Sequence, residues 1–321
     1  MNEHQARLSI VTTLYRSSGT IREFYERCVA AASPHFHDIE LVLVNDGSPD
    51  DSLARALDLK DMDPRVVVVD LSRNFGHHKA MMTGLTVASG EYVFLIDSDL
   101  EEEPELLDTF WSRFQQGGCD VVYGVQETRR GRWFERITGD VFFWLVDRLS
   151  DEKLPRNLVT ARLMTRDYVR ALIRHRDREF FIAHLWLLTG FRQQPVRIRK
   201  LALSPTTYSV TQRVEMLVKY VTTTSTKLLY MILYLGFATA CLSAAGVLYI
   251  IARYLWTGVA TDGWTSLIVS VCFFGGLTIL ILGILGIYIA NIFSETKRRP
   301  YAVVRRIHRH PAAVPAAKML S

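Results

Sequence analysis

Two long runs without a charged residue constrain this chain more than any other feature of its sequence. The first extends from Leu228 to Ala252 and the second from Gly263 to Ser294. A helix needs roughly 20 apolar residues to cross the hydrocarbon core of a bilayer, and both runs are longer than that. Only the short link 253–262 separates them. The sequence therefore predicts a hairpin of two transmembrane helices; two buried helices of a soluble core are the alternative.

The basic residues around the hairpin predict its orientation. Positive charge is concentrated before the first run and after the second, whereas the link offers little beyond Arg253. Loops on the cytoplasmic side of a membrane are enriched in Lys and Arg. The residues Met1 to Arg7 are polar and do not resemble a secretory signal. We therefore expect both termini and the large N-terminal part in the cytoplasm. The flanking basic residues are Lys219, Lys227, Lys297, Arg298, Arg299, Arg305 and Arg306.

Composition excludes several other classes of protein. Hydrophobic residues make up 49% of the 321 residues, which is enough for a folded core and excludes wholesale disorder. The net charge of +5 is too small to indicate a nucleic-acid partner. The four cysteines are far apart, without the spacing of a zinc site or a disulfide framework.

Residues 1–209 alternate between strand and helix patterns. Buried strands separated by helices indicate a mostly parallel sheet with helices on both faces, and such sheets bind ligands at the carboxyl ends of their strands. After this domain we expect a juxtamembrane amphipathic helix at 210–227, the two spans within 228–294 and a basic cytoplasmic tail at 295–321. The predicted strands are 8–14, 39–45, 65–70, 91–96 and 120–124, and the predicted helices include 21–32 and 79–88.

Acidic side chains follow two of the predicted strands. Asp46 follows the second strand, and Asp97 and Asp99 follow the fourth, with Glu101 continuing the alternation. Alternate residues beyond a strand can point the same way, so that their carboxylates converge on one hard cation. Mg²⁺ or Mn²⁺ held in this way usually takes further ligands from phosphates. An acidic loop that favours the N-terminus of the next helix is the alternative.

Several motifs, in this order and spacing, resemble family-two glycosyltransferases with the GT-A fold. Within that family the chain is similar to the bacterial polyisoprenyl-phosphate glycosyltransferases, relatives of dolichol-phosphate-mannose synthase. The similarity covers almost the whole chain up to about Ile307. It implies a Rossmann-like α/β domain and an enzyme of the bacterial cytoplasmic membrane that modifies cell-envelope glycans such as lipopolysaccharide. The motifs are Ser9–Tyr15, Val44–Ser48, Arg73–Gly76 with Lys79 and Ala80, Asp97–Leu100 with Pro104 and Glu105, and the end of the second span with Lys297–Tyr301.

The resemblance implies roles for the residues that bind the donor, a nucleotide-sugar and by family frequency a UDP-sugar. Thr13, Tyr15 and Asp46 would line the nucleotide pocket. Asp97 and Asp99 would bracket the ribose and diphosphate through Mg²⁺ or Mn²⁺, with Glu101 as a further metal ligand. Arg73 would be either a cation for the phosphates or a structural residue of its own turn.

The implied acceptor is undecaprenyl or another polyprenyl phosphate, attacked in a single displacement that inverts the anomeric carbon. A phosphate monoester is mostly dianionic at neutral pH and needs cations to position it rather than a general base. Arg129, Arg130 and Arg136 follow the fifth strand and would bind this phosphate, unless they form a solvated basic face. Lys200 and Ser204 are further candidates. The aromatic helix predicted at 132–149 would lie in the membrane interface or pack in the core.

The sequence is also compatible with two other functions. The acceptor could instead be a hydroxyl of a lipid-linked oligosaccharide or glycolipid, or the chain could be a catalytically inactive membrane scaffold. The sequence contains neither the QxxRW motif of processive synthases nor a GxGxxG motif after the first strand. Relatives form tetramers, and we expect a homo-oligomer. Glycines in the second span that would permit close helix packing are Gly275, Gly276, Gly283 and Gly286.

Overall fold

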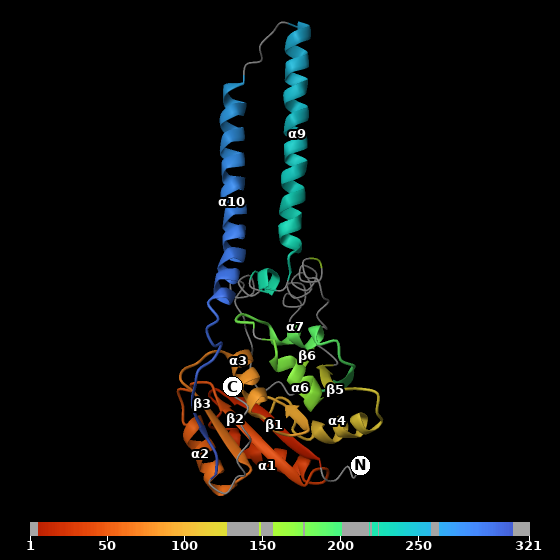
Figure 1. The fold of residues 1–321 in the computed structure, drawn as a ribbon, viewed down its shortest axis with the longest axis vertical. Coiled ribbons are helices and arrows are strands. Elements are labelled where there is room, and N and C mark those ends of the chain that lie inside the picture. The colour runs from red at the N-terminus through yellow and green to blue at the C-terminus, as the bar shows by residue number, and fades with distance from the viewer. Residues whose placement is uncertain are drawn as a thin grey trace. The chain divides into compact units, whose positions relative to one another are not determined.

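The computed structural model describes two compact units of the chain. One unit contains a sheet with its helices and includes residues 299–310, and the other contains two long helices (Figure 1). The described residues are 6–126, 157–175, 177–200, 225–257 and 263–310, together with Arg148, Val218 and 220–223. The predicted interfacial helix 132–149 lies outside them except for Arg148. Most of the predicted helix 210–227 also lies outside them, although 220–223 are helical.

The first unit is built on an eight-stranded mixed sheet in the order β7-β5-β6-β4-β1-β2-β3-β8. The four strands β4, β1, β2 and β3 run parallel to one another, and β7 is parallel to β5. Strands β6 and β8 are antiparallel to their neighbours. This sheet confirms the predicted α/β class. The strands are β1 (Arg7–Leu14), β2 (Asp38–Asn45), β3 (Val66–Leu71), β4 (Tyr92–Leu95), β5 (Val121–Gln126), β6 (Leu158–Thr165), β7 (Gln193–Ile198) and β8 (Val304–His308).

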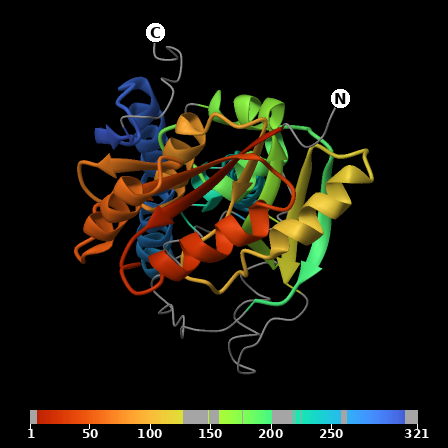
Figure 2. The same ribbon diagram turned by 90° about the horizontal axis from the view of Figure 1, so that it is seen from below.

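Helices cover both faces of this sheet (Figure 2). Helices α1 (Ile21–Ala32), α2 (Ser52–Met62) and α4 (Leu106–Gln115) contribute to one hydrophobic cluster, and α3 (His77–Val87), α6 (Arg166–Ile173) and α7 (Ile182–Leu188) to the other. Because both faces are covered, the central strands are apolar along nearly their whole length instead of alternating.

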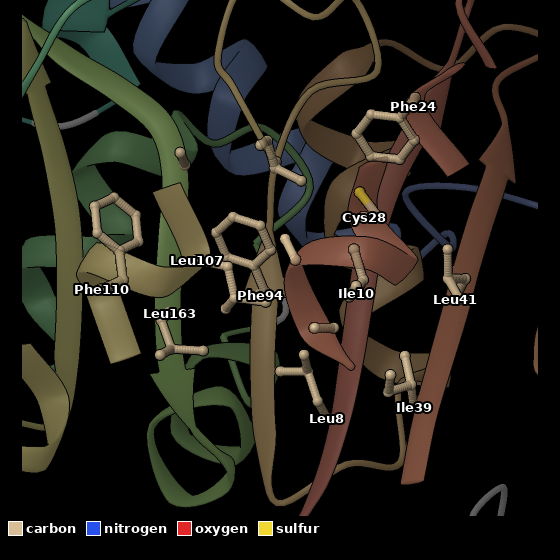
Figure 3. Packing of buried hydrophobic residues seen from close by; sticks show 14 of the residues in the cluster. Leu8, Ile10, Phe24, Cys28, Ile39, Leu41, Phe94, Leu107, Phe110 and Leu163 are labelled. Carbon is tan, nitrogen blue, oxygen red and sulfur yellow. The ribbon is translucent and has the colours of Figure 1, made fainter. Parts of the chain in front are cut away.

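The core on the α1 side shows how this packing is achieved. Leu8 and Ile10 of β1 point toward α1 and lie beside Phe94 of β4 (Figure 3). Phe24 and Cys28 of α1 come down on the same cluster, and all five side chains are almost completely buried. Cys28 thus behaves as a small apolar residue, and burial raises the pKa of its thiol.

The order of the strands creates a switch point between β1 and β4. Strands β2 and β3 extend the sheet on one side of β1, whereas the chain crosses to the other side for β4. In doubly wound sheets the loops at such a point separate and leave a crevice at the carboxyl ends of the strands. The loops after β1 and β4 therefore define the place where a ligand is expected.

The C-terminal segment differs from its prediction. Residues 295–321 were expected to form a basic tail, but Val304–His308 is a strand that pairs antiparallel with β3. The arginines in this segment suggest a solvated tail, but Val304 and Ile307 give it enough strand character to cover the free edge of β3. The prediction did not foresee this strand, and the basic cytoplasmic tail as a whole stays a prediction.

The second unit contains α9 (Lys227–Thr257) and α10 (Trp264–Thr296). Both are long and apolar enough to cross a membrane, and their candidate spans, Lys227–Gly246 and Phe273–Thr296, are not buried in the structure. The two helices overlap the two uncharged runs of the sequence. Tyr288 of α10 donates a hydrogen bond of 2.9 Å to the carbonyl of Ser225, which connects α10 to the segment before α9.

Replacing Gly84 with alanine tests how closely α3 packs on the sheet. A methyl group at Gly84 would lie 2.6 Å from Val11 Cγ1 and 2.8 Å from Val44 Cγ2. Alanine favours a helix by about 1 kcal/mol, but overpacking costs about 1–3 kcal/mol, and these rigid valines cannot move aside cheaply. We expect Gly84→Ala to lower the midpoint of thermal unfolding by about 2–6 °C. Gly19→Ala, whose methyl meets nothing within 4 Å, is the control. An unchanged or higher midpoint for Gly84→Ala would contradict this packing.

Candidate active site

Three segments bring side chains together at the switch point. Thr13 lies near the carboxyl end of β1, Asp97 lies two residues beyond β4, and His77 begins α3. A hydrogen bond of 2.9 Å joins Thr13 Oγ1 to His77 Nδ1, and His77 Nε2 lies 3.2 Å from Asp97 Oδ1. From the sequence, His77 was expected to be a structural or solvated residue and was not among the predicted site residues. Its position directly after the Asn74-Phe75-Gly76 turn, at the carboxyl side of β3, was the available signal.

The carboxylate of Asp97 is held in its charged form by its neighbours. Burial opposes this ionisation, but His77, the Thr160 hydroxyl and Lys200 together lower the pKa of Asp97. Burial also opposes the charging of His77, yet Asp97 raises the pKa of that imidazole above its usual value. Asp97 Oδ1 is buried and accepts no hydrogen bond of good geometry from the described residues. It is therefore an oxygen that a cation could still approach.

Asp99 and Glu101 lie on the loop that follows β4, residues 97–102, which we call the acidic loop. The Asp99 carboxylate accepts a hydrogen bond of 3.0 Å from the backbone N–H of Glu101. Burial, and then the negative charges of Asp97 and Glu101, raise the pKa of Asp99. Lys200 lies 3.1 Å from Glu101 Oε2. Lys200 thus offsets negative charge on the acidic loop. Its predicted contact with the acceptor phosphate stays a prediction.

Glu102 anchors the acidic loop to the sheet. Its carboxylate is fully buried and accepts hydrogen bonds from the backbone N–H groups of Thr160, at 3.2 Å, and Ala161, at 2.7 Å. Burial and the nearby charge of Asp97 raise the pKa of Glu102. Leu100 has a positive φ of 61°, which is unusual for a residue with a side chain, and it is held there by burial in the core. These contacts fix the loop that carries Asp97 and Asp99.

Asp46 binds a backbone segment that we call the 72–76 loop. Its two carboxylate oxygens accept hydrogen bonds from the N–H groups of Phe75, at 2.7 Å, and Gly76, at 3.0 Å. Burial raises the pKa of Asp46, while these two hydrogen bonds act in the opposite direction. The Asp46 side chain therefore fixes the backbone of this loop at Phe75 and Gly76. Its predicted contact with a nucleotide stays a prediction.

The two remaining donor-side residues are exposed. Arg73 donates a hydrogen bond of 2.9 Å to the carbonyl of Asn74, and its guanidinium lies 4.2 Å from the centroid of the Phe75 ring. These contacts correspond to the structural alternative for Arg73. Tyr15 is 47% exposed, so that its ring is accessible at the end of β1. The acceptor-side residues Arg129, Arg130, Arg136 and Ser204 lie outside the described residues.

The acidic loop fits a divalent cation that brings some of its own ligands. Within the part of the chain that the structure describes, no three His, Cys, Asp or Glu side chains form a ready metal-binding group. Mg²⁺, however, is commonly held by only one or two carboxylates together with phosphates and water. The buried Asp97 Oδ1 and the neighbouring Asp99 fit such a site, and Glu101 would have to leave Lys200 to join them.

Comparisons with known proteins show the family to which the chain is similar. A family model described as glycosyl transferase family 2 matches residues 9–180. A protein of Mycobacterium tuberculosis (strain CDC 1551 / Oshkosh), named as a glycosyltransferase without a stated donor or acceptor, is 47% identical over 302 residues, which are 94% of this chain and 88% of that protein.

Two further relatives carry more specific names. A prophage bactoprenol glucosyl transferase homolog of Escherichia coli (strain K12) is 29% identical over 308 residues, which are 94% of this chain and 99% of the relative. The bactoprenol glucosyl transferase of Shigella phage SfII is 29% identical over 310 residues, with the same two shares. The family model covers more than half of the chain and includes most of β1, the acidic loop and α3. The chain therefore belongs to glycosyl transferase family 2.

Proposed function

We propose that this protein transfers one sugar from a nucleotide-sugar, first of all a UDP-sugar, to a polyprenyl phosphate at the membrane. The observation that carries the proposal is the acidic loop with Asp97 and Asp99 at the switch point of the sheet, in a chain that also has two apolar helices. The names of the two bactoprenol relatives support the lipid acceptor.

The donor would bind across the carboxyl ends of β1 and β4. Tyr15 and Thr13 would line the nucleotide, and Asp97 and Asp99 would hold the Mg²⁺ or Mn²⁺ that accompanies the diphosphate. That ion would neutralise the charge that develops on the leaving nucleoside diphosphate. Lys200 opposes the negative charge of the acidic loop, and His77 does so when its ring is protonated. They would limit electrostatic repulsion between this loop and the donor.

The acceptor step would be a single displacement. A phosphate oxygen of the lipid forms a bond to the anomeric carbon, the bond from that carbon to the nucleoside diphosphate breaks, and the configuration inverts. The electron pair of the broken bond leaves with the nucleoside diphosphate. Because the attacking phosphate is already ionised, no side chain has to remove a proton. Arg129, Arg130, Arg136 and Ser204 would position it against the charge of the donor.

The helices α9 and α10 would bring the enzyme to its lipid. We propose that they span the bacterial cytoplasmic membrane as a hairpin, with the sheet unit and both termini in the cytoplasm, and that the protein assembles as a homo-oligomer. The product would be a lipid-linked sugar for modification of cell-envelope glycans.

The proposal predicts a labelled lipid product. Purified full-length protein in detergent is incubated with undecaprenyl phosphate, Mg²⁺ or Mn²⁺ and a panel of labelled nucleotide-sugars that begins with UDP-glucose. We expect one donor to give an organic-soluble product, and Asp99→Asn to reduce its rate by at least about a hundredfold through loss of charge stabilisation. Asp167→Asn, at an exposed acid of α6, is the control and should retain the rate.

The outcomes of this assay separate the alternatives. Donor binding without a lipid-phosphate product, but with sugar transferred to a glycolipid hydroxyl, would replace the acceptor class. No donor binding by the wild-type protein would exclude a transferase and favour a membrane scaffold. Product formation that persists unchanged with a chelator would refute the proposed metal.

A second prediction concerns the 72–76 loop. Asp46→Asn keeps the size of the side chain but turns one of its two acceptors into a donor, which then faces a backbone N–H. The loss of a hydrogen bond to a charged group costs about 2 kcal/mol. We expect a lower unfolding midpoint and a donor KM raised at least about fivefold, with the acceptor KM unchanged. Asp51→Asn, at an exposed position before α2, is the control. Equal donor KM values for the two variants would contradict the role assigned to the loop.

A further inference from the structure

The C-terminal strand β8 contacts the beginning of the 72–76 loop. The backbone N–H of Ser72 donates a hydrogen bond of 2.9 Å to the carbonyl of Val303. The carbonyl of Ser72 accepts a hydrogen bond of 2.9 Å from Arg305 Nη2. Both backbone groups of Ser72 are therefore bound by the segment 303–305, which comes more than two hundred residues later in the chain. The other end of the loop is bound by Asp46.

The same arginine reaches a buried carboxylate. Arg305 Nη1 lies 3.7 Å from Asp70 Oδ2, and Asp70 is only 4% exposed. The other oxygen, Asp70 Oδ1, accepts a hydrogen bond of 2.9 Å from Asn45 Nδ2. Asn45 Oδ1 in turn accepts a hydrogen bond of 3.2 Å from the backbone N–H of Ser48. A chain of polar contacts thus runs from β8 to the turn after β2 that contains Asp46.

A local irregularity in the strand pairing accompanies these contacts. The register between β3 and β8 shifts between Asp70 and Leu71, immediately before the 72–76 loop. A bulge in a strand commonly re-aims the side chains next to it and is frequent beside functional sites. The neighbouring arginine of β8, Arg306, stands opposite Asp70 in the backbone register and is exposed. The two arginines share a strand and a charge, but Arg305 is the one that binds the loop.

We propose that Arg305 is a positioning residue of the donor site. It fixes Ser72 directly and, through Asp70 and Asn45, steadies the turn that carries Asp46. The 72–76 loop is consequently held at both ends, by β8 at Ser72 and by Asp46 at Phe75 and Gly76. This inference rests on the proposed function, because it takes the 72–76 loop to be part of the nucleotide-sugar pocket.

The expected effect of removing Arg305 is moderate. The Arg305 side chain is 63% exposed, and ion pairs at exposed positions contribute little to stability. The hydrogen bond to Ser72 and the burial of the partner Asp70 make the loss of Arg305 larger than that of an ordinary surface ion pair. We expect Arg305→Gln to raise the Kd for UDP by about three- to tenfold. The KM of the acceptor should stay unchanged, because the contacts of Arg305 lie on the donor side.

The predicted change in the Kd for UDP can be measured by calorimetry. UDP is titrated into the full-length protein in detergent, with Mn²⁺ present. The variants are Arg305→Gln, Arg305→Lys and the matched control Arg306→Gln. We expect the weakest UDP binding for Arg305→Gln, a smaller loss for Arg305→Lys and no loss for Arg306→Gln. Hydrogen–deuterium exchange gives a readout that does not depend on nucleotide. Peptides that cover 45–48 and 72–76 should exchange faster in Arg305→Gln than in Arg306→Gln, while peptides from α1 remain unchanged.

The possible results distinguish a failure of the proposed function from a failure of the positioning role of Arg305. If wild-type protein binds neither UDP nor another nucleoside diphosphate, the proposed function fails and this inference fails with it. If wild-type protein binds UDP, and Arg305→Gln and Arg306→Gln have the same Kd and the same loop exchange, the positioning role alone is overturned. Faster exchange throughout the sheet unit of Arg305→Gln would also overturn it, because β8 would then serve general stability.

Discussion

The two backbone hydrogen bonds accepted by Asp46 are the interaction on which the arrangement of this site most depends. A loop that turns back over the edge of a parallel sheet leaves N–H groups without partners from any strand. The buried carboxylate of Asp46 satisfies those of Phe75 and Gly76. Gly47, at a positive φ, lets the turn after β2 pass close to the backbone of Arg73 and Asn74. Since α3 begins directly after Gly76, the same bonds decide where His77 stands.

Next to the 72–76 loop, the acidic loop brings several carboxylates together, and their burial opposes their ionisation. Asp97, Asp99 and Glu102 are carboxylates near one another, and burial works against the ionisation of each. Such charges persist when hydrogen bonds and opposite charges accompany them. Here β6 binds Glu102, and the imidazole of His77 and the ammonium group of Lys200 lie beside the acidic loop. The acidic loop is therefore kept in place by side chains and backbone groups from β6, α3 and the segment after β7.

Much of this could be predicted from the sequence, for definite physical reasons. Strands that are buried on both faces have uninterrupted apolar sequences, and for this reason β1 to β4 could be predicted. The two apolar spans could be predicted in the same way, and α1 was predicted with its observed bounds. The acids at the ends of β2 and β4 were visible because parallel strands all end at one edge. Partners across the fold could not be seen. Nothing near Glu102 in the sequence indicates that it binds β6, and nothing near Lys200 indicates that it faces the acidic loop. Strand β8 was missed because its arginines outweigh its two apolar residues.

The position of β8 in the chain has a consequence for biosynthesis. The carboxyl-terminal edge strand is made only after both long apolar helices, so β3 leaves the ribosome without its final neighbour. At roughly 5–20 residues per second, the chain between Leu71 and Val304 takes about ten seconds or longer to appear. During that interval the edge of β3, rich in valine, is open to pairing with other strands. The sheet can be completed only once the two apolar helices have been synthesised, which makes a finished catalytic unit without its hydrophobic segments impossible during normal translation.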